Sequence, residues 1–169
     1  ALGLVGTEQW ARSLDGEVSG VPALDTDRGR LYVPTNADAS TDPEPASVAT
    51  LALDDGTVAD THRVGDGRTY GVTVHEGDVY ARSSTTCVRL APDGTKRWRR
   101  PLDPLRYDEY NFGDDTATQI PPAVTADAVH LPDRGALVRL DRQSGDEDWP
   151  GPVDTPHAAP VVDDGGVVQ

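Results

Sequence analysis

Residue types that can do chemistry are present in this chain, but their spacing does not favour catalysis. Cys87 is the only cysteine, so the sequence offers no internal disulfide and no cysteine-based metal site. No sequence neighbour of Cys87 would activate its thiol, and its segment alternates in the way a strand does. The histidines occur singly, without the close pairing of zinc sites, at His62, His75, His130 and His157. We therefore expect neither zinc binding nor thiol chemistry.

Carboxylates are the commonest ionisable groups, yet none belongs to a recognisable catalytic or metal-binding set. Among 29 acidic residues, some pair will meet the spacing of a glycosidase by chance, so that criterion has no weight. Asp25 and Asp27, like Asp114 and Asp115, lack the spaced ligands of an EF-hand loop. The Gly-x-Ser-x-Gly elbow of hydrolases does not occur. The sequence predicts no catalytic site and no bound metal.

The charge balance indicates adaptation to high salt. The chain has 29 acidic and 15 basic residues and a net charge of −14; Lys96 is its only lysine, and the acids are spread along its length. At molar salt the Debye length falls to about 3 Å, which screens the mutual repulsion of such a surface. A surface made for a basic partner is the alternative. Phosphate binding needs a longer basic stripe than Lys96–Arg100, so we expect no nucleic-acid partner.

Hydropathy and length indicate one domain outside the bilayer. The 169 residues are enough for a real core, and no run approaches the roughly 20 apolar residues of a membrane span. Residues 1–6 are apolar but too short for a signal peptide. The first residue is Ala1, not Met, and we interpret the chain as processed or as a piece of a longer one.

An internal repeat defines the strands that position the residues discussed above. Segments in which apolar and polar residues alternate are followed by turns that contain Asp and Gly, and then by further segments of this kind. This is the signature of a hairpin. One type of hairpin recurs at residues 48–57, 87–98 and 137–149. A second type precedes each of them, at residues 21–33, 71–81 and 122–131, and begins again at 159–169. A unit of four strands and about 40 to 50 residues predicts an all-β fold, a β-propeller of four-stranded antiparallel blades, as also built by WD40-like repeats.

The pattern resembles the pyrroloquinoline-quinone (PQQ)-like repeat family of quinoprotein-type propellers, and its acidity is similar to that of haloarchaeal members. The third unit matches the typical blade through Pro122–Val124, Leu140-Asp141, Ser144-Gly145 and Trp149. The first unit matches through Pro22-Ala23, Leu31–Val33, Leu53-Asp54 and Gly56 but has Asp60 near the position of the tryptophan. The second departs at Val72, Thr73 and Ala91, and Pro160–Val162 opens a fourth. The resemblance implies that Trp10, Trp98 and Trp149 are structural outer-strand residues that dock between neighbouring blades.

We divide the single propeller unit, residues 1–169, by these matches. Residues 7–14 are predicted as the outer strand of a preceding blade, residues 18–62, 68–102 and 118–152 as whole blades, and residues 157–169 as the start of another. Because propellers usually have four to eight blades, the ring is partial. It is a fragment, or a piece whose exposed edge strands pair with another copy, so self-association remains open.

The predicted strand directions place two long insertions on the same face of the disc. One runs from Pro34 to Ser47 and the other from Asp103 to Thr118. Long loops on a rigid scaffold are where binding sites usually lie. The second insertion combines aromatic and acidic side chains that could hold a peptide, a sugar or a cation, and the alternative is a salt-adapted loop without a partner. The binding-face candidates are Tyr107, Asp108, Glu109, Tyr110, Phe112, Asp114 and Asp115.

The resemblance implies two kinds of function. Some members of the family are non-catalytic scaffolds that assist outer-membrane protein assembly or decorate cell surfaces, and others are PQQ- and calcium-dependent dehydrogenases. The dehydrogenases need calcium ligands, a general-base aspartate and often adjacent cysteines, and none of these motifs can be matched here. We therefore expect a non-enzymatic binding or scaffold domain without a PQQ cofactor, with a protein or peptide partner and an extracellular or cell-surface location; a dehydrogenase fragment is the alternative.

Overall fold

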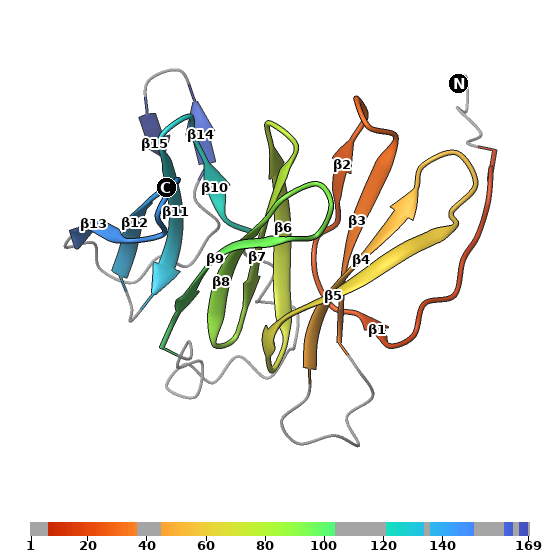
Figure 1. Cartoon of the computed structure of the whole chain (residues 1–169), viewed down its shortest axis with the longest axis horizontal. Coiled ribbons are helices and arrows are strands. Elements are labelled where there is room, and N and C mark those ends of the chain that lie inside the picture. Colours follow the sequence, from red (N-terminus) through yellow and green to blue (C-terminus); the bar gives the residue numbers. More distant parts are fainter. Residues whose placement is uncertain are drawn as a thin grey trace, which may run out of the picture.

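The computed structural model describes residues 7–36, 45–103, 121–133, 136–150, 161–163 and 166–168, and every regular element in these ranges is a β-strand. The strands form antiparallel sheets that lie side by side and fan out in an arc (Figure 1). This arrangement confirms the all-β prediction and differs from the face-to-face packing of a sandwich. The described part of the chain contains no helix with the length and apolar character needed to cross a membrane.

The sheets follow one another along the chain, and we call the three larger ones blades 1 to 3. Blade 1 contains β1 (Glu17–Val18), β2 (Ala23–Asp25), β3 (Arg30–Asn36), β4 (Pro45–Ala52) and β5 (Val58–Asp66). Blade 2 contains β6 (Thr69–His75), β7 (Asp78–Ser83), β8 (Thr86–Leu90) and β9 (Lys96–Pro101). Blade 3 contains β10 (Ala123–Val124), β11 (Ala128–Asp133), β12 (Ala136–Asp141) and β13 (Glu147–Pro150). A hairpin of β14 (Val161–Asp163) and β15 (Gly166–Val168) follows.

Two of the predicted bounds differ from the observed ones. β5 continues to Asp66, past residue 62, because its pairing with β4 persists to the end of that strand. The first insertion is shorter than the predicted Pro34 to Ser47, since β3 and β4 extend into it with Asn36 opposite Ala46. Residues 7–14 lie along blade 1 without belonging to a strand ladder. In blade 1 the innermost strand is interrupted, so that β1 and β2 both pair with β3.

Apolar residues that alternate along the strands form a core between each pair of blades. We call the side of a blade that faces the preceding part of the chain its near face, and the opposite side its far face. Tyr32 and Val48 on the far face of blade 1 pack with Val79 and Leu90 on the near face of blade 2. The next core repeats this arrangement with Tyr80 and Cys87 against Val129 and Leu140. The period of two therefore places every second residue in an interblade core.

The innermost strands of neighbouring blades approach one another closely. The N–H of Val72 donates to the carbonyl of Val21 at 3.3 Å, and the hydroxyl of Thr73 donates to the carbonyl of Pro122 at 2.5 Å. A Cβ atom at Gly71 would lie 2.9 Å from the Cα of Pro121, so a glycine is needed for this approach. These contacts fix the inner edges of the blades, and larger side chains fix the outer edges.

Candidate functional site

Trp98 joins blade 2 to blade 3 at their outer edge. It projects from β9 with only 8% of its surface exposed, and its indole N–H donates to the carbonyl of Arg142 at 2.9 Å. The ring lies against Gly145 in the turn between β12 and β13. Tyr80 packs against Trp98 with the ring centroids 6.2 Å apart and the planes tilted by 58°. Trp98 thus combines apolar burial with a satisfied polar group, which is typical of a structural tryptophan.

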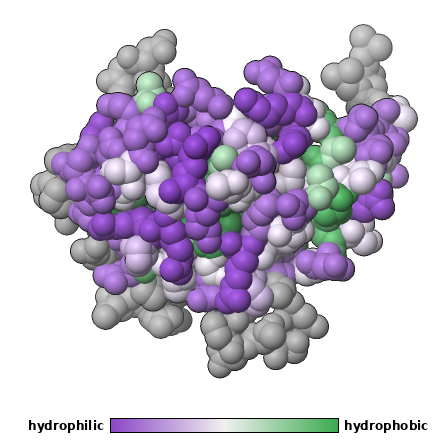
Figure 2. Space-filling view, viewed as in Figure 1, coloured by the Kyte–Doolittle hydropathy of each residue, from purple (hydrophilic) through white to green (hydrophobic). Residues whose placement is uncertain are grey.

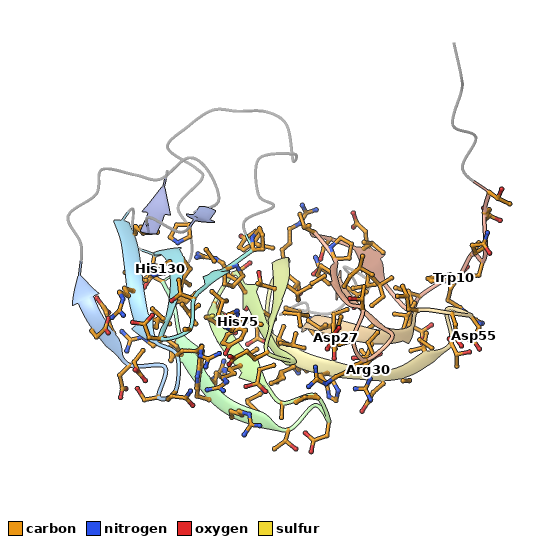
Figure 3. The ribbon with its side chains drawn as sticks, turned by 90° about the horizontal axis from the view of Figure 1, so that it is seen from above. Trp10, Asp27, Arg30, Asp55, His75 and His130 are labelled. Carbon is orange, nitrogen blue, oxygen red and sulfur yellow. The ribbon has the colours of Figure 1, made fainter. Side chains whose placement is uncertain are left out.

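Trp10 makes the same contact on the near face of blade 1. Its indole N–H donates to the carbonyl of Leu53 at 3.0 Å, and a Cβ atom at Gly56 would lie 2.5 Å from its ring. Figure 3 shows Trp10 beside the turn that carries Asp55. Leu53 and Gly56 occupy in their turn the positions that Arg142 and Gly145 occupy in blade 3. Residues 7–14 therefore lie where the outer strand of a preceding blade would lie. The Trp149 backbone is opposite Arg139, just as Trp98 is opposite Arg89.

At the junction of blades 1 and 2, His62 and Arg30 together replace a tryptophan. Asp60 holds the register position of Trp98, as the sequence indicated, but His62 lies against Gly94. The guanidinium of Arg30 donates to the carbonyl of Pro92, which is equivalent to the carbonyl that Trp98 bonds. A cavity of about 10 Å³, lined in part by Tyr32, His62 and Gly94, remains beside this smaller side chain. The hydroxyl of Tyr32 has no hydrogen-bond partner among the described residues.

The glycine beneath each ring gives a testable difference between two substitutions. Gly145→Ala is expected to destabilise the protein by about 2 to 4 kcal/mol, because Gly145 has a φ of 75° and its new Cβ would lie 2.8 Å from Cδ2 of Trp98. Gly29→Ala is the matched control: its φ is 61°, but nothing lies within 4 Å of the new Cβ. We expect Gly29→Ala to cost only about 1 to 2 kcal/mol. Denaturant unfolding in high salt measures both; equal losses would contradict the packing of Trp98 on Gly145.

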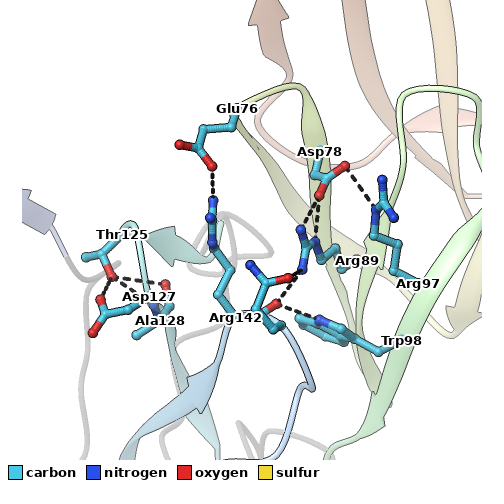
Figure 4. A network of polar contacts seen from close by, with 10 residues as sticks. Glu76, Asp78, Arg89, Arg97, Trp98, Thr125, Asp127, Ala128 and Arg142 are labelled. Carbon is cyan, nitrogen blue, oxygen red and sulfur yellow. Dashed lines mark hydrogen bonds and ion pairs between the residues drawn. The ribbon is translucent and has the colours of Figure 1, made fainter.

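A network of ion pairs connects the turns of blades 2 and 3 (Figure 4). Asp78 accepts hydrogen bonds from Arg89 at 2.7 Å and from Arg97 at 3.3 Å. Arg89 also donates to the carbonyl of Arg142 at 2.8 Å and to the amide oxygen of Gln143 at 3.0 Å. Every one of these groups is bonded to another group of the network, so the network holds the blades together rather than presenting a reactive group.

Two further contacts extend this junction. Arg142 donates to the carboxylate of Glu76 at 2.6 Å, and this hydrogen bond lowers the pKa of Glu76. Glu76 precedes Gly77 in a two-residue turn, and both have positive φ values, as a type I′ hairpin requires. Arg100 of β9 donates to Glu147 of β13 at 2.7 Å. Arg97 and Arg100 of the basic segment 96–100 thus pair with acids of their own chain, as the sequence interpretation expected.

Cys87, the potential nucleophile, and His130 are both buried. Cys87 is fully buried, where desolvation raises the pKa of its thiol to about 12, so the reactive thiolate is suppressed. His130 is buried on β11, and desolvation lowers its pKa. Among the described residues no group of three or more His, Cys, Asp and Glu side chains could hold a metal ion.

The strand ends next to the two insertions form a polar rim on one face, at the lower edge in Figure 1. Arg82 is fully buried there, with its guanidinium 5.8 Å from the centroid of the Tyr70 ring and a hydrogen bond to the carbonyl of Pro132. The hydroxyl of Ser84 lies 3.2 Å from that of Tyr70. The Asp103 N–H donates to a carboxylate oxygen of Asp133 at 3.1 Å. We call Tyr70, Arg82, Ser84, Asp103 and Asp133 the loop-face rim.

The loop-face rim includes Asp103, which directly precedes the segment predicted to bind. Asp103 lies at the start of the second insertion, and the ring of Tyr70 and the side chain of Arg82 lie in neighbouring strands of blade 2. The predicted binding residues fall outside the described residues: Tyr107, Asp108, Glu109, Tyr110, Phe112, Asp114 and Asp115. The sequence did not point to the loop-face rim. Its residues become neighbours only when β6, β7 and β11 bring their ends to one face of the fold.

Comparison with known proteins identifies the fold. No protein-family model matches the chain, and no curated protein matches it. Among solved structures, BamB from Moraxella catarrhalis matches with a TM-score of 0.58 and 16% identity, over 83% of this chain and 38% of BamB. The computationally designed Ika4 protein matches with a TM-score of 0.60 and 12% identity, over 93% of this chain and 85% of Ika4.

A third match is the quinohemoprotein alcohol dehydrogenase ADHIIG from Pseudomonas putida HK5. Its TM-score is 0.55 and its identity 18%, over 83% of this chain and 22% of the dehydrogenase. This chain therefore spans well under half of both BamB and the dehydrogenase. These identities are too low to transfer an activity, so the likeness concerns the fold alone. The chain has the fold of the PQQ-type β-propellers, of which it forms part of a ring.

Proposed function

We propose that this chain is part of a non-catalytic PQQ-like propeller that binds a protein or peptide, adapted to high salt. The observation that carries the proposal is the loop-face rim, where Tyr70 and buried Arg82 form a fixed base beside the start of the aromatic second insertion. A rigid sheet edge that supports a loop rich in aromatic residues is suited to recognition, because aromatic side chains supply most of the energy at binding hot spots.

The charged groups elsewhere support the non-catalytic interpretation. At the turns of blades 2 and 3, Asp78, Arg89 and Arg142 are engaged in interblade contacts, and Cys87 is a buried thiol. A net charge of −14 fits a protein that stays soluble in molar salt. A cell-surface location is proposed with this function, on the strength of the family resemblance.

The test is capture of partners in 2 M KCl with the whole chain as bait. We expect the variant Tyr107→Ala/Tyr110→Ala/Phe112→Ala to lose its specific partners, with recovery reduced about tenfold or more, because three aromatic contacts are removed. The matched control is Ser40→Ala/Thr41→Ala/Asp42→Ala in the first insertion, which should retain them. Equal recovery by the aromatic variant and the native chain would remove this loop from consideration.

A PQQ-dependent dehydrogenase is the competing function, favoured by the fold it shares with the alcohol dehydrogenase. The described residues do not fit the cofactor: they contain no cluster of carboxylates for calcium, and their only cysteine is buried. We expect PQQ with Ca²⁺ to leave the melting temperature in high salt unchanged, within about 1 °C, with Ca²⁺ alone as the control. A rise that requires both PQQ and Ca²⁺ would support the dehydrogenase instead.

A further inference from the structure

The outer strand of blade 2 carries a basic surface on an acidic protein. The net charge of the chain is −14, yet four of the five residues from Lys96 to Arg100 are basic. Arg97 and Arg100 pair with acids of their own chain. Lys96 and Arg99 are exposed, and no ion pair engages either of them within the part of the chain that the structure describes. Figure 2 shows mainly hydrophilic atoms over the middle of the molecule, where β9 lies in Figure 1.

β9 is also an open edge of its sheet. It is the last strand in the order β6-β7-β8-β9, so one side of its backbone has no partner strand among the described residues. At its end, the N–H of Leu102 donates to the carbonyl of Thr85 at 2.8 Å. Facing pairs alternate between bonded and non-bonded along an antiparallel ladder, so Arg99 and Val88 form a non-bonded pair and the N–H and carbonyl of Arg99 point outward. Arg99 therefore presents a donor, an acceptor and a positive side chain at one point of the edge.

The outward N–H is blocked at the equivalent positions of blades 1 and 3, directly after the tryptophan position. Thr61 holds this position in β5, and its N–H donates to the carboxylate of Asp60 at 2.7 Å. Pro150 holds it in β13, and a proline has no N–H to donate. Proteins protect exposed strand edges with such devices, because an open edge can pair with another strand. Neither device is present at Arg99, whose N–H has no acceptor among the described residues.

We propose that the outer edge of blade 2 is a second binding site, where an extended acidic segment of a partner protein adds to the sheet as a further strand. Main-chain hydrogen bonds to the N–H and carbonyl of Arg99 hold the segment, and its carboxylates lie against Lys96 and Arg99. The net charge of −14 repels an acidic segment from most of the surface, so the basic edge determines where it docks. The site uses none of the residues on which the proposed function rests.

The probe is an eight-residue peptide of alternating Glu and Thr with blocked ends. We expect it to bind the whole chain with a dissociation constant of about 1 mM or less in about 0.5 M KCl, and a peptide with Lys in place of Glu to bind about tenfold more weakly. Nitrogen-15 NMR follows the titration. The backbone amide of Arg99 should shift and exchange its hydrogen more slowly, because its N–H gains an acceptor. A titration without saturable shifts up to about 5 mM peptide would overturn the proposal.

Two variants separate strand addition from simple attraction between charges. Arg99→Pro removes the outward N–H as Pro150 does in blade 3, and it should weaken peptide binding about tenfold or more. Arg99→Ala is the matched control: it loses the same charge but keeps the N–H, so it should weaken binding only about threefold. If both variants weakened binding equally, the peptide would be held by charge alone and the proposal would be wrong.

A change in the peptide gives the same test without a change in the protein. A peptide whose amide bonds are replaced by esters keeps its charges and length but has no N–H donor for the carbonyl of Arg99. It should bind about fivefold more weakly or worse, and unchanged binding would overturn strand addition.

Two further titrations test the place of the site and the class of partner. The variant Tyr107→Ala/Tyr110→Ala/Phe112→Ala should bind the acidic peptide as the native chain does, and a loss of binding would place the site on the loop face instead. An oligothymidylate should not compete with the peptide, because the basic edge is short and the rest of the chain is acidic. Displacement of the peptide by the oligothymidylate would assign the edge to nucleic acid and overturn the proposal.

Discussion

Replacement of Trp98 by alanine is expected to lower the free energy of unfolding by about 3 to 5 kcal/mol. The substitution removes a ring that is buried between Tyr80 and Gly145, and it leaves the buried carbonyl of Arg142 with one donor fewer. A cavity would remain because the two blades are also held by their inner strands and cannot simply collapse. Urea unfolding in 2 M KCl, followed by circular dichroism, measures the loss.

Trp10→Ala is the matched comparison for this prediction. Trp10 makes the same hydrogen bond and lies on the equivalent glycine, but it is only partly buried and belongs to a segment without strand pairing. We expect a loss of about 1 to 2 kcal/mol, in proportion to its smaller buried area. If Trp10→Ala were as costly as Trp98→Ala, Trp10 would have to be buried as fully as Trp98, which would contradict its partial burial in the structure.

Asp78→Ala should lower the free energy of unfolding about as much as Trp98→Ala. Asp78 is the partner of Arg89, whose side chain is 9% exposed, and Asp78→Ala would leave that guanidinium buried without its counter-charge. Breaking a buried pair from one side costs about 3 to 5 kcal/mol. Asp127→Ala is the control, because Asp127 pairs with Arg139 but is 75% exposed, so its loss should destabilise the protein far less than the loss of Asp78.

Salt separates these two variants further. A buried pair is screened little, so the loss in Asp78→Ala should persist between 0.2 and about 2 M KCl, whereas any effect of Asp127→Ala should vanish. Thermal and urea unfolding at both salt concentrations make the measurement. A loss in Asp78→Ala that disappears in high salt would show that the pair is solvated and that the network of Figure 4 contributes little to the blade junction.

The fold could be predicted from the sequence because the pattern that indicates each hairpin lies within a short stretch of the chain. Alternation along each strand and the turns with Gly56, Gly94 and Gly145 are visible in the chain, and each determines a hairpin without reference to distant residues. The position of Asp60 in place of a tryptophan was also visible. The replacement of that tryptophan by His62 with Arg30 was not, because Arg30 comes from β3 and meets a carbonyl of blade 2 only once both blades are formed.

The candidate site was predicted less fully for the same reason. The aromatic loop at residues 107–115 stands out by composition, and its function stays a prediction. Arg82 looks like an ordinary alternating strand residue in the sequence, yet it is fully buried against Tyr70 and bonded to blade 3. An arginine is rarely so buried unless it is paired, so composition offered no signal for it. Its neighbours are separated by up to about 50 residues along the chain, and only the blade stacking joins them.

The contact on which the whole arrangement depends is that between an outer-strand tryptophan and the turn glycine of the following blade. A double-mutant cycle with Trp98→Ala and Gly145→Ala tests it directly. Once Trp98 is absent, Gly145→Ala should cost only the backbone strain seen at Gly29, so the double variant should be less destabilised than the sum of the single variants by about 1 to 3 kcal/mol. Strictly additive losses would mean that the ring and the turn do not touch, and that the blades are not stacked in this way.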